Sequence, residues 1–284
     1  MPEKGLTLVE LLIVLAVISL LLALSFPALM SVRNQAQGAV CLQNIRTLAL
    51  AWLVYKDDND DRLVGGHVGK YSHDWVQGPT GPGTFIEQKK EGIRRGALFR
   101  YTGNTVDVYR CPADQRTLGQ GQTAFRSYSI AGGANGEGWQ NTYEQALKYS
   151  EILQPATKYV FVEEADPRGW NKGSWVLDPQ TRTWVDPLAI WHSRARSTLG
   201  YADGHSEIRK WTDPSTVEMS RKQAFFQPVP LDQGEDLRFM VGGFPQKGPE
   251  APQGARITRA VYRTGRLWPP MSAAGSERPG NRYQ

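Results

Sequence analysis

No set of residues in this chain has the spacing of a familiar catalytic motif. The sequence contains no Gly-x-Ser-x-Gly, no His-Glu-x-x-His, no phosphate-binding P-loop and no Cys-x-x-Cys pair. Glu163 and Glu164 are adjacent carboxylates at the end of an apolar run. Neighbouring side chains in a strand point to opposite faces, so these two make a poor acid/base pair. The sequence therefore predicts that the protein is not an enzyme.

His192, Asp203, His205 and the acidic run 57–61 could offer ligands to a metal ion. Carboxylate and carbonyl oxygens suit calcium, whereas imidazole does not. The weak calcium candidates are therefore Asp58, Asp60 and Asp203. The acidic run lacks the spacing and the terminal Glu of an EF-hand loop. The favoured interpretation is that no metal or other cofactor binds, that His192 donates a hydrogen bond across a hairpin, and that Asp203 and Gly204 form its turn.

One further carboxylate, Glu10, opens a long apolar run. Residues 11–24 read LLIVLAVISLLLAL and carry no charge. A charged Glu in hydrocarbon costs about 2.5–3.5 kcal/mol, so it needs a partner or a task. The mostly apolar segment from Leu6 to Leu24, at about 1.5 Å per residue, forms a helix of roughly 28 Å, close to the thickness of a bilayer core.

Apolar residues continue at helical spacing from residue 29 to residue 53, interleaved with Arg, Asn and Gln. We therefore predict one long helix over 6–56, transmembrane over 6–24 and amphipathic beyond it. Pro27 lacks an N–H and is expected to bend this helix. The apolar stripe of the second half requires a globular domain folded onto it, which we place at 57–211.

Strand signals follow within that domain. The predicted strands cover 158–162, 174–177, 183–185, 198–202 and 205–211. The second and third flank Asp178-Pro179 and predict a hairpin. The last two flank Asp203-Gly204, which favours a type I′ turn. With a short helix expected over 144–151, the fold class is α+β: a long N-terminal helix packed on an antiparallel sheet with loop-rich insertions.

Residues 212–284 are predicted to be a C-terminal extension, partly extended or disordered, with one additional strand over 256–268. The formal net charge of the 284-residue chain is +5. Its basic residues are scattered, apart from a cluster near the C-terminus, and no helix-turn-helix, zinc-finger or RRM pattern accompanies them. Nucleic acid is therefore not an expected partner.

The segment Lys4-Gly5-Leu6-Thr7-Leu8-Val9-Glu10 with its apolar run resembles the N-terminus of type IV pilins and type II secretion pseudopilins. In that family a prepilin peptidase cuts after the Gly and methylates the new N-terminus. The resemblance implies a leader at 1–5, cleavage between Gly5 and Leu6, N-methylation of Leu6 and a role for Glu10 in assembly. Leu6 departs from the usual Phe. A plain secretory signal is the alternative, but its apolar region is about 7–15 residues long and lacks an acid.

The same resemblance implies a subunit of a type IV pilus-like or type II secretion pseudopilus filament. Its partners would be other pilin or pseudopilin subunits, the prepilin peptidase and an inner-membrane assembly platform. The chain would cross the inner membrane once, with its globular domain in the periplasm. The alternative is a membrane-anchored periplasmic or cell-surface protein that binds glycan or matrix through tryptophans and does not polymerise.

Trp191-His192 and Tyr201-Ala202-Asp203-Gly204-His205 resemble the prepilin-associated H-X9-DG segment, as do 41–46, 55–60 and 109–112. Ten residues rather than nine separate His192 from Asp203 here, and the loop 193–196 is the natural place for the additional one. Major pseudopilins also carry a calcium loop near the C-terminus, which keeps calcium among the expectations.

Cys41 and Cys111 are the only cysteines. The export that the resemblance implies would place them in an oxidising compartment, where an even count favours a disulfide. A Cys41–Cys111 bridge would tie the helix to the domain. The alternative is two separate buried thiols that behave as small hydrophobes.

Overall fold

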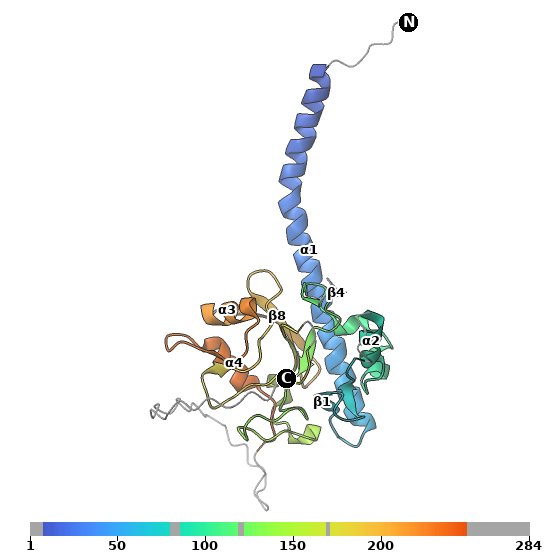
Figure 1. Ribbon diagram of the computed structural model, residues 1–284, viewed down its shortest axis with the longest axis vertical. Coiled ribbons are helices and arrows are strands. Elements are labelled where there is room, and N and C mark those ends of the chain that lie inside the picture. Colours follow the sequence, from blue (N-terminus) through green and yellow to red (C-terminus); the bar gives the residue numbers. More distant parts are fainter. Residues whose placement is uncertain (1–7, 80–85, 119–121, 169–170, 249–284) are drawn as a thin grey trace, which may run out of the picture. The chain divides into compact units, whose positions relative to one another are not determined.

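The computed structural model describes residues 8–79, 86–118, 122–168 and 171–248 (Figure 1). The predicted strand at 256–268 lies outside these residues. The α-helices are α1 (Leu8–Asp58), α2 (Ile86–Arg94), α3 (Pro214–Lys222) and α4 (Glu235–Gly243). Short 3-10 helices are η1 (Phe99–Thr102), η2 (Asp107–Tyr109), η4 (Tyr149–Glu151) and η5 (Pro155–Thr157). The strands are β1 (Gly65–Val68), β2 (Asp74–Val76), β3 (Thr117–Leu118), β4 (Gln122–Thr123), β5 (Tyr128–Ile130), β6 (Tyr159–Glu163), β7 (Thr183–Trp184), β8 (Arg196–Tyr201), β9 (Ser206–Lys210) and β10 (Gln227–Pro228).

Helix α1 runs unbroken through Pro27 and ends two residues beyond the predicted limit. It curves along its length (Figure 1). Its buried positions recur every three or four residues, which is the spacing of one helical face. They are Gly38, Cys41, Ile45, Leu48, Ala49, Ala51, Trp52 and Tyr55. The amphipathic half of the helix is therefore an integral part of the folded domain.

The main sheet has the order β5-β6-β8-β9, and all its neighbouring strands are antiparallel. This confirms the α+β prediction. The predicted hairpin at Asp203-Gly204 joins β8 and β9, but its turn is not type I′. Only Gly204 has a positive φ, +89°. The Tyr201 N–H donates to the His205 carbonyl at 2.9 Å, which closes a three-residue loop with Gly204 in the left-handed region.

Helix α1 approaches the sheet closely at Gly200 of β8. A Cβ atom at this position would lie 3.2 Å from both the side chain and the carbonyl oxygen of Ile45. A glycine here lets the backbone of β8 approach α1, so that Ile45 and Phe161 pack directly over the strand.

Several predicted elements are wrong because tertiary contacts override local propensity. Residues 174–177 and 183–185 do not pair with each other: Trp175 bridges Ala131, and β7 pairs with β10. The helix expected over 144–151 is reduced to η4.

The extension predicted from residue 212 is folded as far as residue 248. Helices α3 and α4 cover a second apolar cluster with Met219, Leu237, Met240 and Phe244. The carboxylate of Asp236 accepts hydrogen bonds from the backbone N–H groups of Thr212 and Asp213, at 2.9 and 2.8 Å. These contacts fix the start of α3 onto α4.

The tryptophans considered for ligand stacking are mostly core residues. Trp75, Trp175 and Trp184 are fully buried, whereas Trp139 is half-buried against Phe226 at 5.7 Å between ring centroids. Trp170 lies outside the described residues. The three buried indoles cannot offer a face to a sugar at the surface.

Candidate functional site

The side chains in the N-terminal part of α1 are exposed. Every described side chain from Leu8 to Ala36 is exposed, including Glu10 in the first turn. Among the described residues, α1 is the one helix that is long and apolar enough to span a membrane. Gly5 and Leu6 lie outside the described residues. An apolar surface of this length needs lipid or neighbouring helices to cover it.

Where α1 reaches the sheet, four polar side chains converge: Cys41, Cys111, Glu163 and His192. The Cys41 Sγ lies 2.7 Å from Glu163 Oε1, and His192 Nε2 lies 3.0 Å from the same oxygen. The Cys111 Sγ lies 3.6 Å from His192 Nε2. All four potential ligand atoms lie within 4.8 Å of one another. Three of these residues are fully buried, and His192 is 7% exposed.

Strand geometry directs Glu163 towards this cluster. A register shift in the pairing of β6 with β8 falls between Tyr159 and Phe161. Beyond it the strand alternates, so Phe161 packs in the cluster that contains α1, whereas Val162 packs in the second cluster. Glu163 bonds to Cys41 on α1, and Glu164 instead accepts a hydrogen bond from Ser129 on β5. The two carboxylates face opposite ways, as predicted.

The other cluster residues are held by backbone contacts. His192 exchanges two backbone hydrogen bonds with Arg196 at the start of β8. The Thr198 N–H donates to Glu163 Oε2 at 2.8 Å. The Cys111 N–H, just after η2, donates to Ser127 Oγ at 3.0 Å. His192, Glu163 and Cys111 are thus each held in place by a hydrogen bond to a neighbouring segment.

The electrostatics of the cluster follow from burial and proximity. Burial alone favours the neutral imidazole, but hydrogen bonds with Cys111 and Glu163 outweigh it and raise the pKa of His192 to about 10. Burial, with help from neighbouring Cys111 and Glu163, raises the pKa of the Cys41 thiol well above its usual value. In this form the cluster is a buried His–Glu ion pair beside a protonated thiol.

The cluster bears on two predictions. Cys41 and Cys111 are neighbours, and the structure has both as free thiols, without the predicted disulfide between them. Their sulfurs make hydrogen bonds to the carboxylate and the imidazole instead. His192 does not bond across the β8–β9 hairpin or to Asp203. The Asp203 carboxylate contacts His205 Nδ1 at 2.5 Å, and this pair stays at the surface.

The weak calcium candidates do not form a site together. Within the described part of the chain, the group of His, Cys and acidic side chains compact enough to hold a metal ion is the Cys41 cluster, which contains none of Asp58, Asp60 and Asp203.

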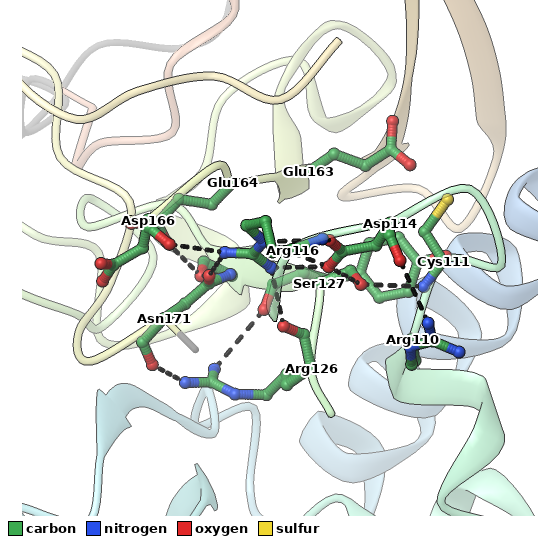
Figure 2. Close-up of polar contacts among 12 residues, drawn as sticks. Arg110, Cys111, Asp114, Arg116, Arg126, Ser127, Glu163, Glu164, Asp166 and Asn171 are labelled. Atoms are coloured by element: carbon green, nitrogen blue, oxygen red, sulfur yellow. Dashed lines mark hydrogen bonds and ion pairs between the residues drawn. The ribbon is translucent and has the colours of Figure 1, made fainter. Parts of the chain in front are cut away.

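A buried polar network adjoins the cluster (Figure 2). Arg116 pairs with Asp114 at 2.7 Å and also donates to Asn171 Oδ1 at 2.9 Å and to the Asp166 carbonyl at 3.0 Å. Ser127 donates to Asp114 at 2.7 Å. The network therefore ties the segment that carries Cys111 to the segment that follows Glu163.

The carboxylate of Asp186, which lies outside this network, predicts that the stability of the fold depends on pH. Burial raises the pKa of Asp186 to about 8; the Val176 N–H, which donates to it at 2.5 Å, opposes the rise, and the nearby Glu137 carboxylate adds to it. An unfolded Asp titrates near 3.9. The folded state therefore prefers protonated Asp186, and this contribution to stability is complete below about pH 4 and is lost as the pH rises through about 8.

We expect Asp186→Asn to remove this part of the pH dependence. The variant should match the wild type below about pH 4 and exceed it by at least about 1 kcal/mol near pH 9, after allowance for solvent screening at this half-buried position. Urea unfolding of the full chain in detergent at both pH values measures the difference. If the free energies of unfolding of the two proteins change with pH in parallel, the raised pKa does not belong to Asp186.

Comparison with known proteins adds one finding. The family model for the prokaryotic N-terminal methylation motif matches residues 1–26. No curated protein and no solved structure gives a significant match. The N-terminus therefore carries a class III, prepilin-type signal, and the exposed apolar helix that follows it is consistent with membrane anchoring.

Sequence patterns pointed to Cys41, Cys111 and His192 but not to Glu163, the partner that Cys41 and His192 share. Glu163 was considered only as half of a poor acid/base pair. A buried-strand pattern that ends in a carboxylate is a signal for a partnered charge, because an unpaired buried carboxylate is costly. That signal does not identify the partners.

Proposed function

We propose that this protein is a pilin-like subunit that a prepilin peptidase cuts after Gly5 and that assembles into a filament through α1. The observation that carries the proposal is the division of one continuous helix. Every side chain of residues 8–36 is exposed, and the apolar run 11–24 within them carries no charge, whereas the later turns are built into the domain. In the membrane, lipid solvates the exposed part; in a filament, the same part of neighbouring subunits replaces the lipid.

In this proposal the leader is cytoplasmic, the globular domain is periplasmic, and the new N-terminus of Leu6 is methylated. The partners are other pilin or pseudopilin subunits and an inner-membrane assembly platform, and the subunit is not a catalyst. The filament is a pilus-like structure or a secretion pseudopilus. A surface-binding protein that never polymerises is the competing function, and the filament assay below distinguishes it.

Glu10 provides the test. Cleavage creates a cationic amine on Leu6, and the Glu10 carboxylate is expected to pair with that amine on a neighbouring subunit. Two unit charges about 4 Å apart attract by roughly 4 kcal/mol at an effective dielectric of 20. Because desolvation offsets much of this attraction, the pair mainly sets the register between the helices of neighbouring subunits. We expect Glu10→Leu and Glu10→Gln to be inserted, cleaved and folded, yet to be absent from sheared surface filaments.

Ser19→Ala is the matched control. Its hydroxyl is satisfied within its own helix by the Leu15 carbonyl at 2.7 Å, so its loss should leave filament yield unchanged. Immunoblots of sheared and cell-bound fractions measure assembly, and N-terminal mass analysis measures cleavage. Wild-type filament yield from Glu10→Leu would refute the register role. Absence of the wild-type chain from filaments would refute the proposed function itself.

A further inference from the structure

The Cys41 cluster combines chain segments that are remote in sequence. Cys41 comes from α1, Cys111 from the turn after η2, Glu163 from the end of β6, and His192 from the loop before β8. Two sulfurs, a carboxylate oxygen and an imidazole nitrogen face one point inside the protein. A simple helix–sheet contact would be filled by apolar side chains, because burying four polar groups is unfavourable unless they bind something or one another.

The dimensions are close to those of a tetrahedral zinc site. Zinc lies about 2.3 Å from sulfur and about 2.0–2.2 Å from nitrogen or oxygen, so the ligand atoms of a tetrahedron are separated by about 3.3–3.8 Å. The Cys111 Sγ to His192 Nε2 distance is 3.6 Å, and His192 Nε2 to Glu163 Oε1 is 3.0 Å. The shortest edge, Cys41 Sγ to Glu163 Oε1, is 2.7 Å and must lengthen by about 1 Å on binding.

We propose that Cys41, Cys111, Glu163 and His192 bind one Zn²⁺ ion that fastens α1 to the sheet. Thiolate and imidazole ligands select zinc over calcium or magnesium. All four residues are buried, which is typical of a closed structural site rather than a catalytic one with an open position.

Surrounding groups suit a metal-bound thiolate. The hydroxyl groups of Tyr128 and Thr198 lie 3.0 and 3.2 Å from Cys41 Sγ and can both donate to it. Two thiolates and a carboxylate leave one net negative charge around Zn²⁺, which such donors stabilise. The second Glu163 oxygen is already oriented by the Thr198 N–H, and the Arg116 network fixes the Cys111 side of the site (Figure 2).

A Cys41–Cys111 disulfide is the competing chemistry, since the two sulfurs lie within 4.8 Å and the proposed compartment is oxidising. A disulfide would use two of the four groups and would need neither the carboxylate nor the imidazole. Zinc uses all four, and this convergence favours the metal.

The test uses the full chain, purified from membranes in detergent without chelator. We expect one zinc ion per chain by elemental analysis, and two thiols that react with alkylating reagent only after denaturation with chelator. Replacement of the metal by Co²⁺ should give the visible bands of a tetrahedral site with thiolate-to-cobalt charge transfer. Disulfide-linked Cys41 and Cys111 peptides from the membrane-derived protein would overturn the proposal, as would reduced protein that remains metal-free after equilibration with Zn²⁺.

Glu163→Gln and Glu164→Gln form a matched pair. They make the same change at adjacent positions, but only Glu163 faces the cluster. We expect Glu163→Gln to bind Zn²⁺ more than about 100-fold more weakly, because even changes outside the ligand shell cost about 10–100-fold. Glu164→Gln should keep full zinc content. Circular dichroism establishes that each variant is folded, and equal zinc affinity in two folded variants would overturn the assignment of Glu163. His192→Gln supplies a second ligand variant if Glu163→Gln does not fold.

Discussion

Replacing Gly5 with valine is expected to leave the entire protein as uncut precursor that begins at Met1, whereas the wild type should begin at Leu6. Glycine at the cleavage site lets the peptidase approach the backbone closely, and a branched side chain blocks that approach. The substitution precedes both the apolar run and the globular domain in the chain, so the variant should still insert and fold. Intact-mass and N-terminal analysis of the membrane fraction measure the outcome directly.

The control for this experiment is Glu3→Val, which places the same side chain elsewhere in the leader. We expect it to be cut after Gly5 like the wild type, so a defect confined to Gly5→Val assigns the cleavage site. A wild-type N-terminus beyond residue 20 would instead identify an ordinary secretory signal and would remove the anchor from the mature protein.

Trp52→Ala is expected to lower the free energy of unfolding by about 3–5 kcal/mol, which is typical of a large aromatic side chain deleted from a core. Trp52 is fully buried on the face of α1 that meets the domain, and its ring packs edge-on against Tyr149 at 5.8 Å. The Tm should fall by roughly 10 °C, since 1 kcal/mol corresponds to about 2–4 °C in a domain of this size. Thermal or urea unfolding of the full chain in detergent measures the effect.

Two companion variants make the result specific. Trp52→Phe keeps a ring against Tyr149 and removes an indole N–H that has no hydrogen-bond partner, so its loss of stability should be smaller. Val54→Ala lies on the exposed side of the same turn, at 50% exposure, and should change stability by no more than about 0.5 kcal/mol. Similar midpoints for Trp52→Ala and the wild type would mean that this end of α1 is outside the cooperative core.

Elements with a strong local pattern were predicted well. The two halves of α1 differ because one is apolar on all sides and the other has a single apolar stripe, and both patterns can be read directly from the sequence. The Asp203-Gly204 hairpin was located because a glycine at positive φ between strand-like runs is a local signal. Its turn type was wrong, since a three-residue loop with only Gly204 in the left-handed region also satisfies that pattern.

Elements that depend on remote partners were predicted poorly. The run at 183–185 reads as half of a hairpin, but β7 pairs with β10 because the second apolar cluster brings the chain after residue 214 across it. The segment from residue 212 reads as partly extended or disordered because it is rich in Pro, Gly and Gln. Its helices α3 and α4 are stabilised by burying Met219, Leu237 and Met240, and a local pattern does not reveal that burial.

The sequence by itself determined the prepilin-type N-terminus, the exposed anchor and the helix–sheet class, since each depends on residues close together in the chain. Only the tertiary structure decided what the two cysteines do. Glu163 and Cys41 are 122 residues apart, and Cys111 and His192 are 81 apart. Which of these side chains meet depends on strand order, on the register shift in β6 that turns Glu163 towards α1, and on the network around Arg116. These are cooperative properties of the folded domain, so no spacing in the sequence encodes them.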